Sequence, residues 1–246
     1  MHFRLASYNI AKGTTQFARR VRILDVKTAL HRLEADVVCL QEVQNRNDRL
    51  SRTNTDYPYA RQMDLLAGAH FDHSVYAANK HYNHGHHGNA VLARFPVLAH
   101  RNVDLSTRSI ERRGALIVTL DAGNGRQLHV VSTHFSLLAR DRLLQAQALS
   151  GTLSRTVPAS DPLIIAGDFN DWHRKVDAVL RAELGVHEAF DHSHTLPART
   201  FPSFMPLLRL DRIYLRGVKS RQAQVLGGLA WARRSDHVPI MAELSL

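Results

Sequence analysis

The sequence predicts an α+β protein in which two β-sheets pack together and helices lie outside them. Segments with strand character outnumber helical segments and mostly follow one another along the chain. Helical spacing appears after the first strand and again near the middle of the chain. A strand–helix–strand–acid order near the N-terminus also recurs between residues 127 and 168. This echo is faint, but it favours two related halves.

The elements of the N-terminal half follow from hydrophobic periodicity. Residues 3–9 alternate as a strand does, whereas apolar residues recur at three- and four-residue spacing over 17–34, which predicts a helix. The remaining predictions are a buried strand at 35–43, loop with some helix at 44–72, and paired strands at 73–78 and 89–95 around a histidine-rich loop. Pro96 ends the last of these strands.

The C-terminal half is predicted in the same way. Two apolar runs joined by "AGNG" predict a hairpin over 113–135. Helices are predicted at 138–156 and 173–184, and strands at 162–169, 208–215 and 237–244, with a weaker strand near 222–229. Neither a linker nor a low-complexity tract interrupts the chain, so we expect one domain over residues 1–246.

Composition limits the class of protein. Hydrophobic residues make up 44% of the chain, which is enough for a sizeable core. Cys39 lies in an apolar run and is expected to be a buried thiol, and a single cysteine excludes a disulfide framework and a cysteine-based zinc site. The N-terminus reads directly as a strand rather than a signal peptide, and no apolar run approaches the ~20 residues that span a bilayer. We therefore expect a soluble, cytoplasmic protein.

The charge indicates an anionic partner. The formal net charge is +10, and only five of the 32 basic residues are lysine. Arginine holds phosphate through a planar, bidentate guanidinium, so nucleic acid, anionic lipid or a phosphorylated small molecule is favoured. Biased base composition of the genome explains an arginine-rich chain equally well, and both interpretations stay open.

Polar side chains stand where apolar runs stop. A strand-end Asn or Asp is usually a turn former or a cap, and a single His beside an apolar run is usually structural. Taken together, however, these residues are of the types that hold a hard cation and move protons. They are Asn9, Glu42, His134, Asp168, Asn170, Asp211, Asp236 and His237. Asp171, which follows them in "GDFND", is expected only to cap the next helix.

Several sequence blocks resemble the endonuclease/exonuclease/phosphatase superfamily, which includes DNase I-like nucleases and exonuclease III-like repair enzymes. The blocks are "SYNI", "QEV", "GNAVLARFP", "STHF", "GDFN", "LDRIY" and "SDHVPI", and they extend from residue 5 to residue 244. The chain is most similar to compact bacterial members of this length, whose substrates are poorly defined. The resemblance implies a DNase I-like, four-layer α/β/β/α sandwich, with the site where the two sheets open.

The resemblance also implies a metal centre. Hydrolysis of a phosphate ester requires that charge on the phosphoryl group be neutralised and that a water be aimed in line. Glu42, at the end of a buried strand, is the clearest ligand, and oxygen ligands in a thiol-free site indicate Mg²⁺ or Mn²⁺. The family pattern makes Asn9 its neighbour, and we expect Asp236 to support the metal and Asp211 to support a metal or a histidine.

The remaining positions are assigned to proton transfer and phosphate binding. Asp168 would orient or deprotonate the attacking water, and His237, paired with Asp236, would be a general base or would polarise the phosphate. Which of Asp168 and His237 activates the water stays open. We expect the phosphate or the leaving oxygen to be held by His134, Asn9, Asn89, Arg113 and Asn170. Strand alternation would send Arg112 and Arg113 to opposite faces, and similarity to family members favours Arg113 as the one toward the site.

Two segments allow two interpretations each. The histidines of the His81–His87 loop form either a second metal site or, as we favour, a substrate-facing loop. The apolar residues of 201–208 either pack over the core, which we favour, or form an apolar rim that stacks on a base or dips into lipid.

The function predicted is hydrolysis of a phosphodiester by a divalent-metal enzyme, with nucleic acid slightly favoured over a phospholipid head group or an inositol phosphate. The rival is a non-catalytic binder of nucleic acid or of an anionic membrane surface. The complete set of acids favours the enzyme, whereas the substrate and the oligomeric state do not follow from the sequence.

Overall fold

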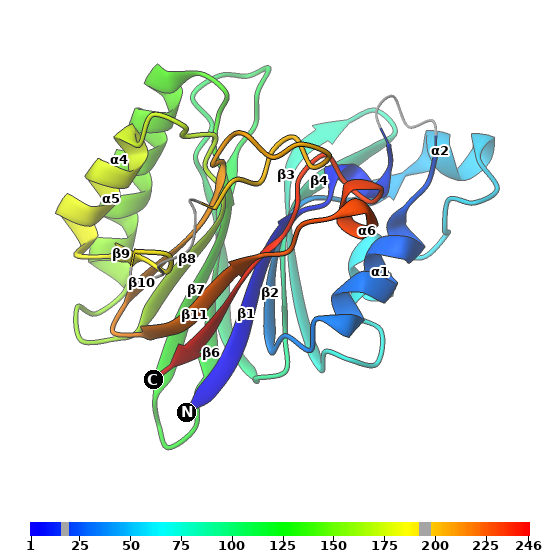
Figure 1. Cartoon of the computed structure of the whole chain (residues 1–246). Coiled ribbons are helices and arrows are strands. Elements are labelled where there is room, and N and C mark those ends of the chain that lie inside the picture. The colour runs from blue at the N-terminus through cyan, green and yellow to red at the C-terminus, as the bar shows by residue number, and fades with distance from the viewer. Residues whose placement is uncertain (16–19, 192–197) are drawn as a thin grey trace.

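The structure is a computed structural model that describes residues 1–15, 20–191 and 198–246. Two mixed six-stranded β-sheets face each other, and helices cover the outer face of each (Figure 1). The predicted four-layer α/β/β/α sandwich is therefore confirmed. The strand order is β11-β12-β1-β2-β4-β3 in the first sheet and β5-β6-β7-β8-β10-β9 in the second.

The strands of the first sheet are β1 His2–Asn9, β2 Val37–Asn47, β3 His73–Tyr82, β4 Gly85–Ala93, β11 Lys219–Val225 and β12 Ile240–Ser245. Those of the second sheet are β5 Val97–Asp104, β6 Gly114–Asp121, β7 Gln127–His134, β8 Leu163–Asp168, β9 His187–Glu188 and β10 Asp211–Arg216. The helices are η1 Ala11–Gly13, α1 Ile23–Arg32, α2 Asp48–Thr53, α3 Gln62–Ala67, α4 Ala139–Thr156, α5 Lys175–Leu184 and α6 Leu229–Ala232.

Each sheet contains one parallel strand pair, and both pairs are built in the same way. Strands β1 and β2 are parallel and joined through α1, and strands β7 and β8 are parallel and joined through α4. The echo in the sequence therefore corresponds to two β–α–β units, one in each sheet. Glu42 lies in the second strand of the first unit, and Asp168 ends the second strand of the other.

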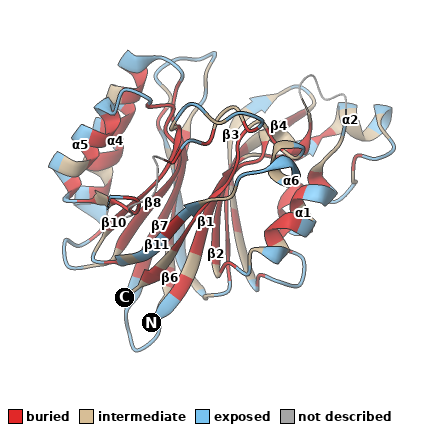
Figure 2. Cartoon of the chain, viewed as in Figure 1, coloured by how far each residue is buried: buried red, intermediate tan, exposed pale blue. Residues whose placement is uncertain are grey.

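Strand alternation divides the core into three layers (Figure 2). Leu5, Cys39 and Ile164 belong to the cluster between the sheets, which confirms Cys39 as a buried thiol. The next residues along two of these strands, Ala6 and Leu40, pack under α1 and α3 in a second cluster. A third cluster packs the other sheet against α4 and α5. This two-residue period decides which strand-end side chains face the space between the sheets.

Several boundaries differ from the predictions. Residues 17–19 of the first predicted helix lie outside the described residues, and the described helix starts at Ile23. The structure adds β5, β9 and α6, and it places short helices α2 and α3 within 48–67. The supposed histidine-rich loop is mostly strand, because β3 and β4 pair from His73 to Ala93 and leave only a tight turn at 83–84. No helix in the part of the chain that the structure describes is long and apolar enough to cross a membrane.

Candidate active site

Three polar side chains of the second sheet lie in one row at the ends of adjacent strands. In the pairing register His134 of β7 is opposite Asp168 of β8, and Asp211 of β10 is opposite the same Asp168. Residues two and four positions before Asp168, Ala166 and Ile164, belong to the core between the sheets. Alternation therefore aims Asp168 into the space between the sheets, and the same argument applies to His134 and Asp211.

Asn9 reaches this row from the first sheet. Phe3 and Leu5 of β1 face the inter-sheet core, so the odd-numbered Asn9 points the same way. Its Nδ2 donates to Asp168 Oδ2 at 3.1 Å, and its Oδ1 accepts the backbone N–H of Ala11 at 3.1 Å. The two sheets thus meet at Asp168 through a buried hydrogen bond.

Glu42 breaks the alternation of β2. Leu40 and Val43 both belong to the helix-side cluster, and the register with β4 shifts between them. Glu42 itself has a φ of 57°, which is uncommon for a residue with a side chain. Such a bulge re-aims one side chain, and here it turns Glu42 out of the helix-side layer. Glu42 Oε1 lies 4.0 Å from His134 Nδ1, so the bulge within β2 of one β–α–β unit meets the end of β7 in the other.

Lys12 is a site residue that the sequence reasoning missed. Its Nζ donates to Glu42 Oε2 at 2.8 Å. Burial alone would raise the pKa of the Glu42 carboxyl, but the Lys12 ammonium outweighs burial and lowers the pKa. The available signal was a lysine three residues after Asn9, in a chain with only five lysines.

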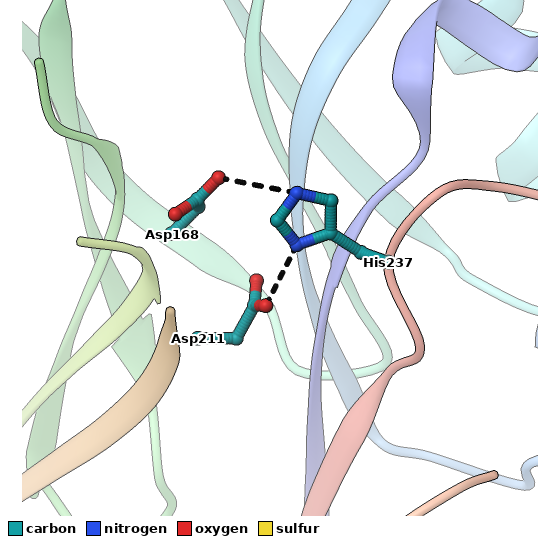
Figure 3. Close-up of side chains that lie close together, drawn as sticks. All are labelled: Asp168, Asp211 and His237. Carbon is teal, nitrogen blue, oxygen red and sulfur yellow. Dashed lines mark hydrogen bonds and ion pairs between the residues drawn. The ribbon is translucent and has the colours of Figure 1, made fainter. Parts of the chain in front are cut away.

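His237 lies between two carboxylates (Figure 3). Its Nδ1 is 2.8 Å from Asp211 Oδ2, and its Nε2 is 3.6 Å from Asp168 Oδ2. The prediction that Asp236 is the partner of His237 is wrong. Asp211 occupies the Nδ1 side of the imidazole, and Asp236 Oδ1 instead accepts from the Ser235 hydroxyl at 3.3 Å.

The pKa values of His237 and Asp168 are both raised. Burial alone would lower the pKa of His237, but the charges of Asp211 and Asp168 outweigh it and raise the pKa to about 10. Burial raises the pKa of the Asp168 carboxyl to about 6, with the charge of His237 opposing the rise and that of Asp211 adding to it. The raised pKa indicates that His237 carries a proton between the two carboxylates.

His134 is neutral and held in one tautomer. Burial, followed by the positive charge of Arg113, lowers its pKa well below the ordinary value. An Arg113 guanidinium N–H donates to His134 Nδ1 at 3.2 Å, so the ring proton is on Nε2, which lies 3.4 Å from Asp168 Oδ2. Asn170 Nδ2 is 3.3 Å from the same Nε2, and it donates to the Phe135 carbonyl at 3.0 Å. Arg113 also binds Glu111 at 2.9 Å.

Two neighbouring predictions need correction or qualification. Residues 110–113 precede β6 and are not strand, so the alternation argument for Arg112 and Arg113 was wrong, although Arg113 does reach His134. Arg112 lies 3.6 Å from the exposed Asp104. Asn89 is buried, and its Nδ2 donates to the carbonyls of Gly114 and Ser132, which ties the first sheet to the second.

Asp171 caps α5 as the sequence predicted. Its carboxylate accepts the backbone N–H groups of Lys175 and Val176 at 3.1 and 2.8 Å. It is therefore the structural member of "GDFND", whereas Asp168 and Asn170 turn toward His134.

The chemistry of the donor set fits a divalent cation. Asp168, Asp211 and His237 are buried, and one ligand atom of each lies within 4.8 Å of the others. Asp211 Oδ1 is buried without a hydrogen-bond partner, which is costly for a carboxylate oxygen unless a cation or a polar ligand satisfies it. At Glu42, the Lys12 ammonium already occupies the place beside the carboxylate that a metal ion would take.

The histidines of 81–87 do not form a comparable group. Over residues 1–15, 20–191 and 198–246, the Asp168–Asp211–His237 set is the only group of three with metal-ligand spacing. The rings of His81 and His86 lie 5.4 Å apart, and Tyr76 Oη hydrogen-bonds His86 Nδ1 at 2.9 Å. Burial lowers the pKa of His87 to about 4, and the charge of nearby Glu42 opposes that shift.

A groove of about 940 Å³ adjoins these residues. Glu42 and Asp236 line it, whereas Asp168, Asp211 and His237 lie in the buried cluster behind them. The cationic side chains in the lining are Lys12, Arg49, Arg233 and Arg234. The groove can therefore admit an anionic group next to Glu42.

The favoured interpretation of 201–208 was wrong. Phe204, Met205, Leu207 and Leu208 are exposed rather than packed over the core. Only the start of the segment is tied to the site, since the Phe201 ring lies 5.0 Å from that of His237.

Fold and site define a class of four-layer sandwich proteins that carry acids and imidazoles where two sheets open. Comparison with known proteins gives the family. The model of the Endonuclease/Exonuclease/phosphatase family matches residues 6–237. The "Uncharacterized protein YbhP" of Escherichia coli (strain K12) is 36% identical over 245 residues, which cover 99% of this chain and 96% of that protein.

Solved structures agree in fold. An endonuclease/exonuclease/phosphatase from Bacteroides vulgatus superposes with a TM-score of 0.79 at 20% identity, covering 100% of this chain and 99% of the other. The mannosyl-6-phosphatase Bt3783 of Bacteroides thetaiotaomicron gives 0.75 at 16% identity, covering 99% and 100%. The chain belongs to the endonuclease/exonuclease/phosphatase family, whose members are generally metal-dependent phosphoesterases.

Replacing Lys12 should strengthen cation binding at Glu42. In Lys12→Gln the carboxylate loses its ammonium partner, and removing a unit positive charge ~4 Å from a divalent ion is worth ~2 kcal/mol even at the dielectric constant of water, or ~30-fold in affinity. Calorimetric titration with Mn²⁺ measures the effect. Lys219→Gln, an exposed lysine of β11, is the control and should leave the affinity unchanged. Equal or weaker binding by Lys12→Gln would show that Lys12 does not compete with the ion.

Proposed function

We propose that this protein is a divalent-metal-dependent phosphoesterase that hydrolyses a phosphodiester by attack of water on phosphorus. The observation that supports it most is the convergence of Glu42 from one sheet with His134, Asp168 and Asp211 from the other. A binder without catalysis has no need for carboxylates that are buried, and burying them carries a free-energy cost.

The ion is assigned to Glu42, with Asp211 as a second carboxylate ligand. The earlier assignment of Asn9 and Asp236 as further ligands remains a prediction, and the Asn9 oxygen already accepts one backbone N–H. When bound, Mg²⁺ or Mn²⁺ would supply positive charge against the phosphoryl oxygens.

Asp168 and His237 act on the attacking water. Asp211 fixes Nδ1 of His237, so Nε2 remains directed toward Asp168, and the two groups form one path for a proton. Which of them first takes the proton from water depends on the charge of the bound ion.

Phosphate binding falls to the groups on the opposite side of Asp168. Arg113 holds His134 in the tautomer whose Nε2 carries a proton, so this imidazole can donate to a phosphoryl or leaving oxygen. Asn170 and Asn9 bring amide N–H groups to the same place. The arginines of the groove then suit the single negative charge of a diester extending away from the site.

The proposal is tested by turnover of bis-p-nitrophenyl phosphate with Mg²⁺ or Mn²⁺. We expect activity that chelation with EDTA abolishes, that either ion restores, and that Glu42→Gln reduces by at least ~10²-fold because a carboxylate ligand becomes neutral. The monoester p-nitrophenyl phosphate should be turned over more slowly. Folded protein without turnover on any metal would refute the proposal, and faster turnover of the monoester would refute the diester preference.

The proton path predicts a ranking of variants. Asp168→Asn and His237→Ala should each lower the rate by at least ~10²-fold, because proton transfer and charge stabilisation of that order are lost. Asp211→Asn should cost at least ~10-fold more than Asp236→Asn, since only Asp211 orients the imidazole. Circular dichroism establishes that each variant is folded. A larger loss in Asp236→Asn than in Asp211→Asn would show that Asp236, not Asp211, orients the imidazole.

A further inference from the structure

The exposed apolar side chains of 204–208 form a knuckle beside the site. Phe204, Met205, Leu207 and Leu208 follow one another within five residues, and Phe204 is 77% exposed. Single exposed apolar residues are ordinary on protein surfaces, but four on one tip mark a contact surface.

Main-chain hydrogen bonds hold the knuckle in shape. The N–H of Met205 donates to the Pro202 carbonyl at 3.1 Å, and those of Leu207 and Leu208 donate to the Phe201 carbonyl at 2.9 and 2.8 Å. A hydrogen-bonded turn therefore holds these exposed apolar side chains.

The knuckle is also attached to the catalytic segment. The Ser203 N–H donates to the Asp236 carbonyl at 2.8 Å, and the Ser203 hydroxyl donates to the Ser235 carbonyl at 2.7 Å. Both acceptors immediately precede His237. A surface that binds the knuckle would therefore also lie against the opening of the groove.

Positive charge surrounds the knuckle. Arg233 and Arg49 line the groove that Phe204 also lines, and both are exposed. Arg199, which precedes the same segment, is also exposed. Among the described residues none of these three guanidinium groups has an ion-pair or hydrogen-bond partner, so their charge is available to an external anion.

A second apolar group lies on the other side of the site. Ile110 and Leu137 are 74% and 60% exposed, and the Leu137 N–H donates at 3.4 Å to Glu111, which in turn binds Arg113. In Figure 1 the loop that contains residues 105–113 and the segment 199–210 both lie along the upper edge of the molecule. Apolar tips thus flank the site on two sides.

We propose that this edge docks on an anionic phospholipid bilayer, with the knuckle in the interfacial layer and a lipid phosphodiester head group in the groove. The assignment of the head group as substrate rests on the proposed function, whereas the docking does not. Apolar side chains interleaved with arginine are the chemistry of interfacial binding, in which burial of apolar area adds to attraction for anionic lipid.

Other occupants fit less well. Nucleic acid without sequence preference is held by aromatic platforms, but the knuckle is mainly aliphatic and offers one phenyl ring. A second copy of this chain meeting the same edge would bring unpaired arginines together, and like charges oppose such an interface.

Flotation with lipid vesicles in EDTA tests docking without turnover. Wild-type protein should bind vesicles of phosphatidylglycerol and phosphatidylcholine at least ~10-fold more strongly than vesicles of phosphatidylcholine alone. The double variant Met205→Ser/Leu207→Ser should lose at least ~10-fold in binding to the anionic vesicles. Its turnover of bis-p-nitrophenyl phosphate should be unchanged, since neither residue lines the groove.

The chain offers a matched control. Met205 and Leu207 are 55% and 52% exposed, and Leu24 of α1 and Leu98 of β5 are 56% and 52% exposed. Leu24→Ser/Leu98→Ser removes comparable apolar surface elsewhere and should bind vesicles as wild-type does.

Four results would overturn the docking: no preference for anionic vesicles, equal losses in the two double variants, a dimer in sedimentation that Met205→Ser/Leu207→Ser dissociates, or oligonucleotide binding that this variant alone loses. Vesicle binding by protein without phosphodiesterase activity would refute the proposed function and leave the docking intact. Activity without vesicle binding would refute only the docking.

Discussion

The pairing register of β7, β8 and β10 is the constraint on which the site depends. It places His134, Asp168 and Asp211 side by side, and the two-residue period of each strand turns all three toward the opposite sheet. A slip of β8 by one residue would send Asp168 into the helix layer and bring an apolar neighbour to the site. Close packing protects this register, because a Cβ on Gly167 would lie 1.9 Å from the Thr133 carbonyl oxygen.

Charge balance is the second requirement. Asp168 and Asp211 are both buried, and two carboxylates cannot stay ionised there without compensation. His237 supplies one positive charge from the segment before β12, and Lys12 does the same for Glu42. The protein's own cations therefore offset two of the three carboxylate charges, and a divalent ion would offset the rest. A phosphate group that enters the site also meets positive charge, because Arg113 and the groove arginines lie next to the acids.

The sequence predicted the layers of the fold and the strand ends that converge, because alternation and strand-end position are local properties of the chain. It left open whether Asp211 supports a metal or a histidine and paired His237 with Asp236, because the Asp211–His237 contact joins residues 26 positions apart. Glu42 was identified by type, but the bulge that aims it depends on the register with β4. The apolar segment at 204–208 had two interpretations because composition alone does not distinguish a core residue from an exposed one. The roles of the site residues, the ion and the substrate remain proposals.

The most direct test of the convergence of strand ends is the anomalous scattering of manganese in crystals grown with Mn²⁺. The account predicts a manganese peak within coordination distance of the Glu42 and Asp211 carboxylates, with Lys12 moved off Glu42. A peak bound elsewhere on the chain, or a fully loaded protein in which Glu42 keeps Lys12 as its partner, would contradict it.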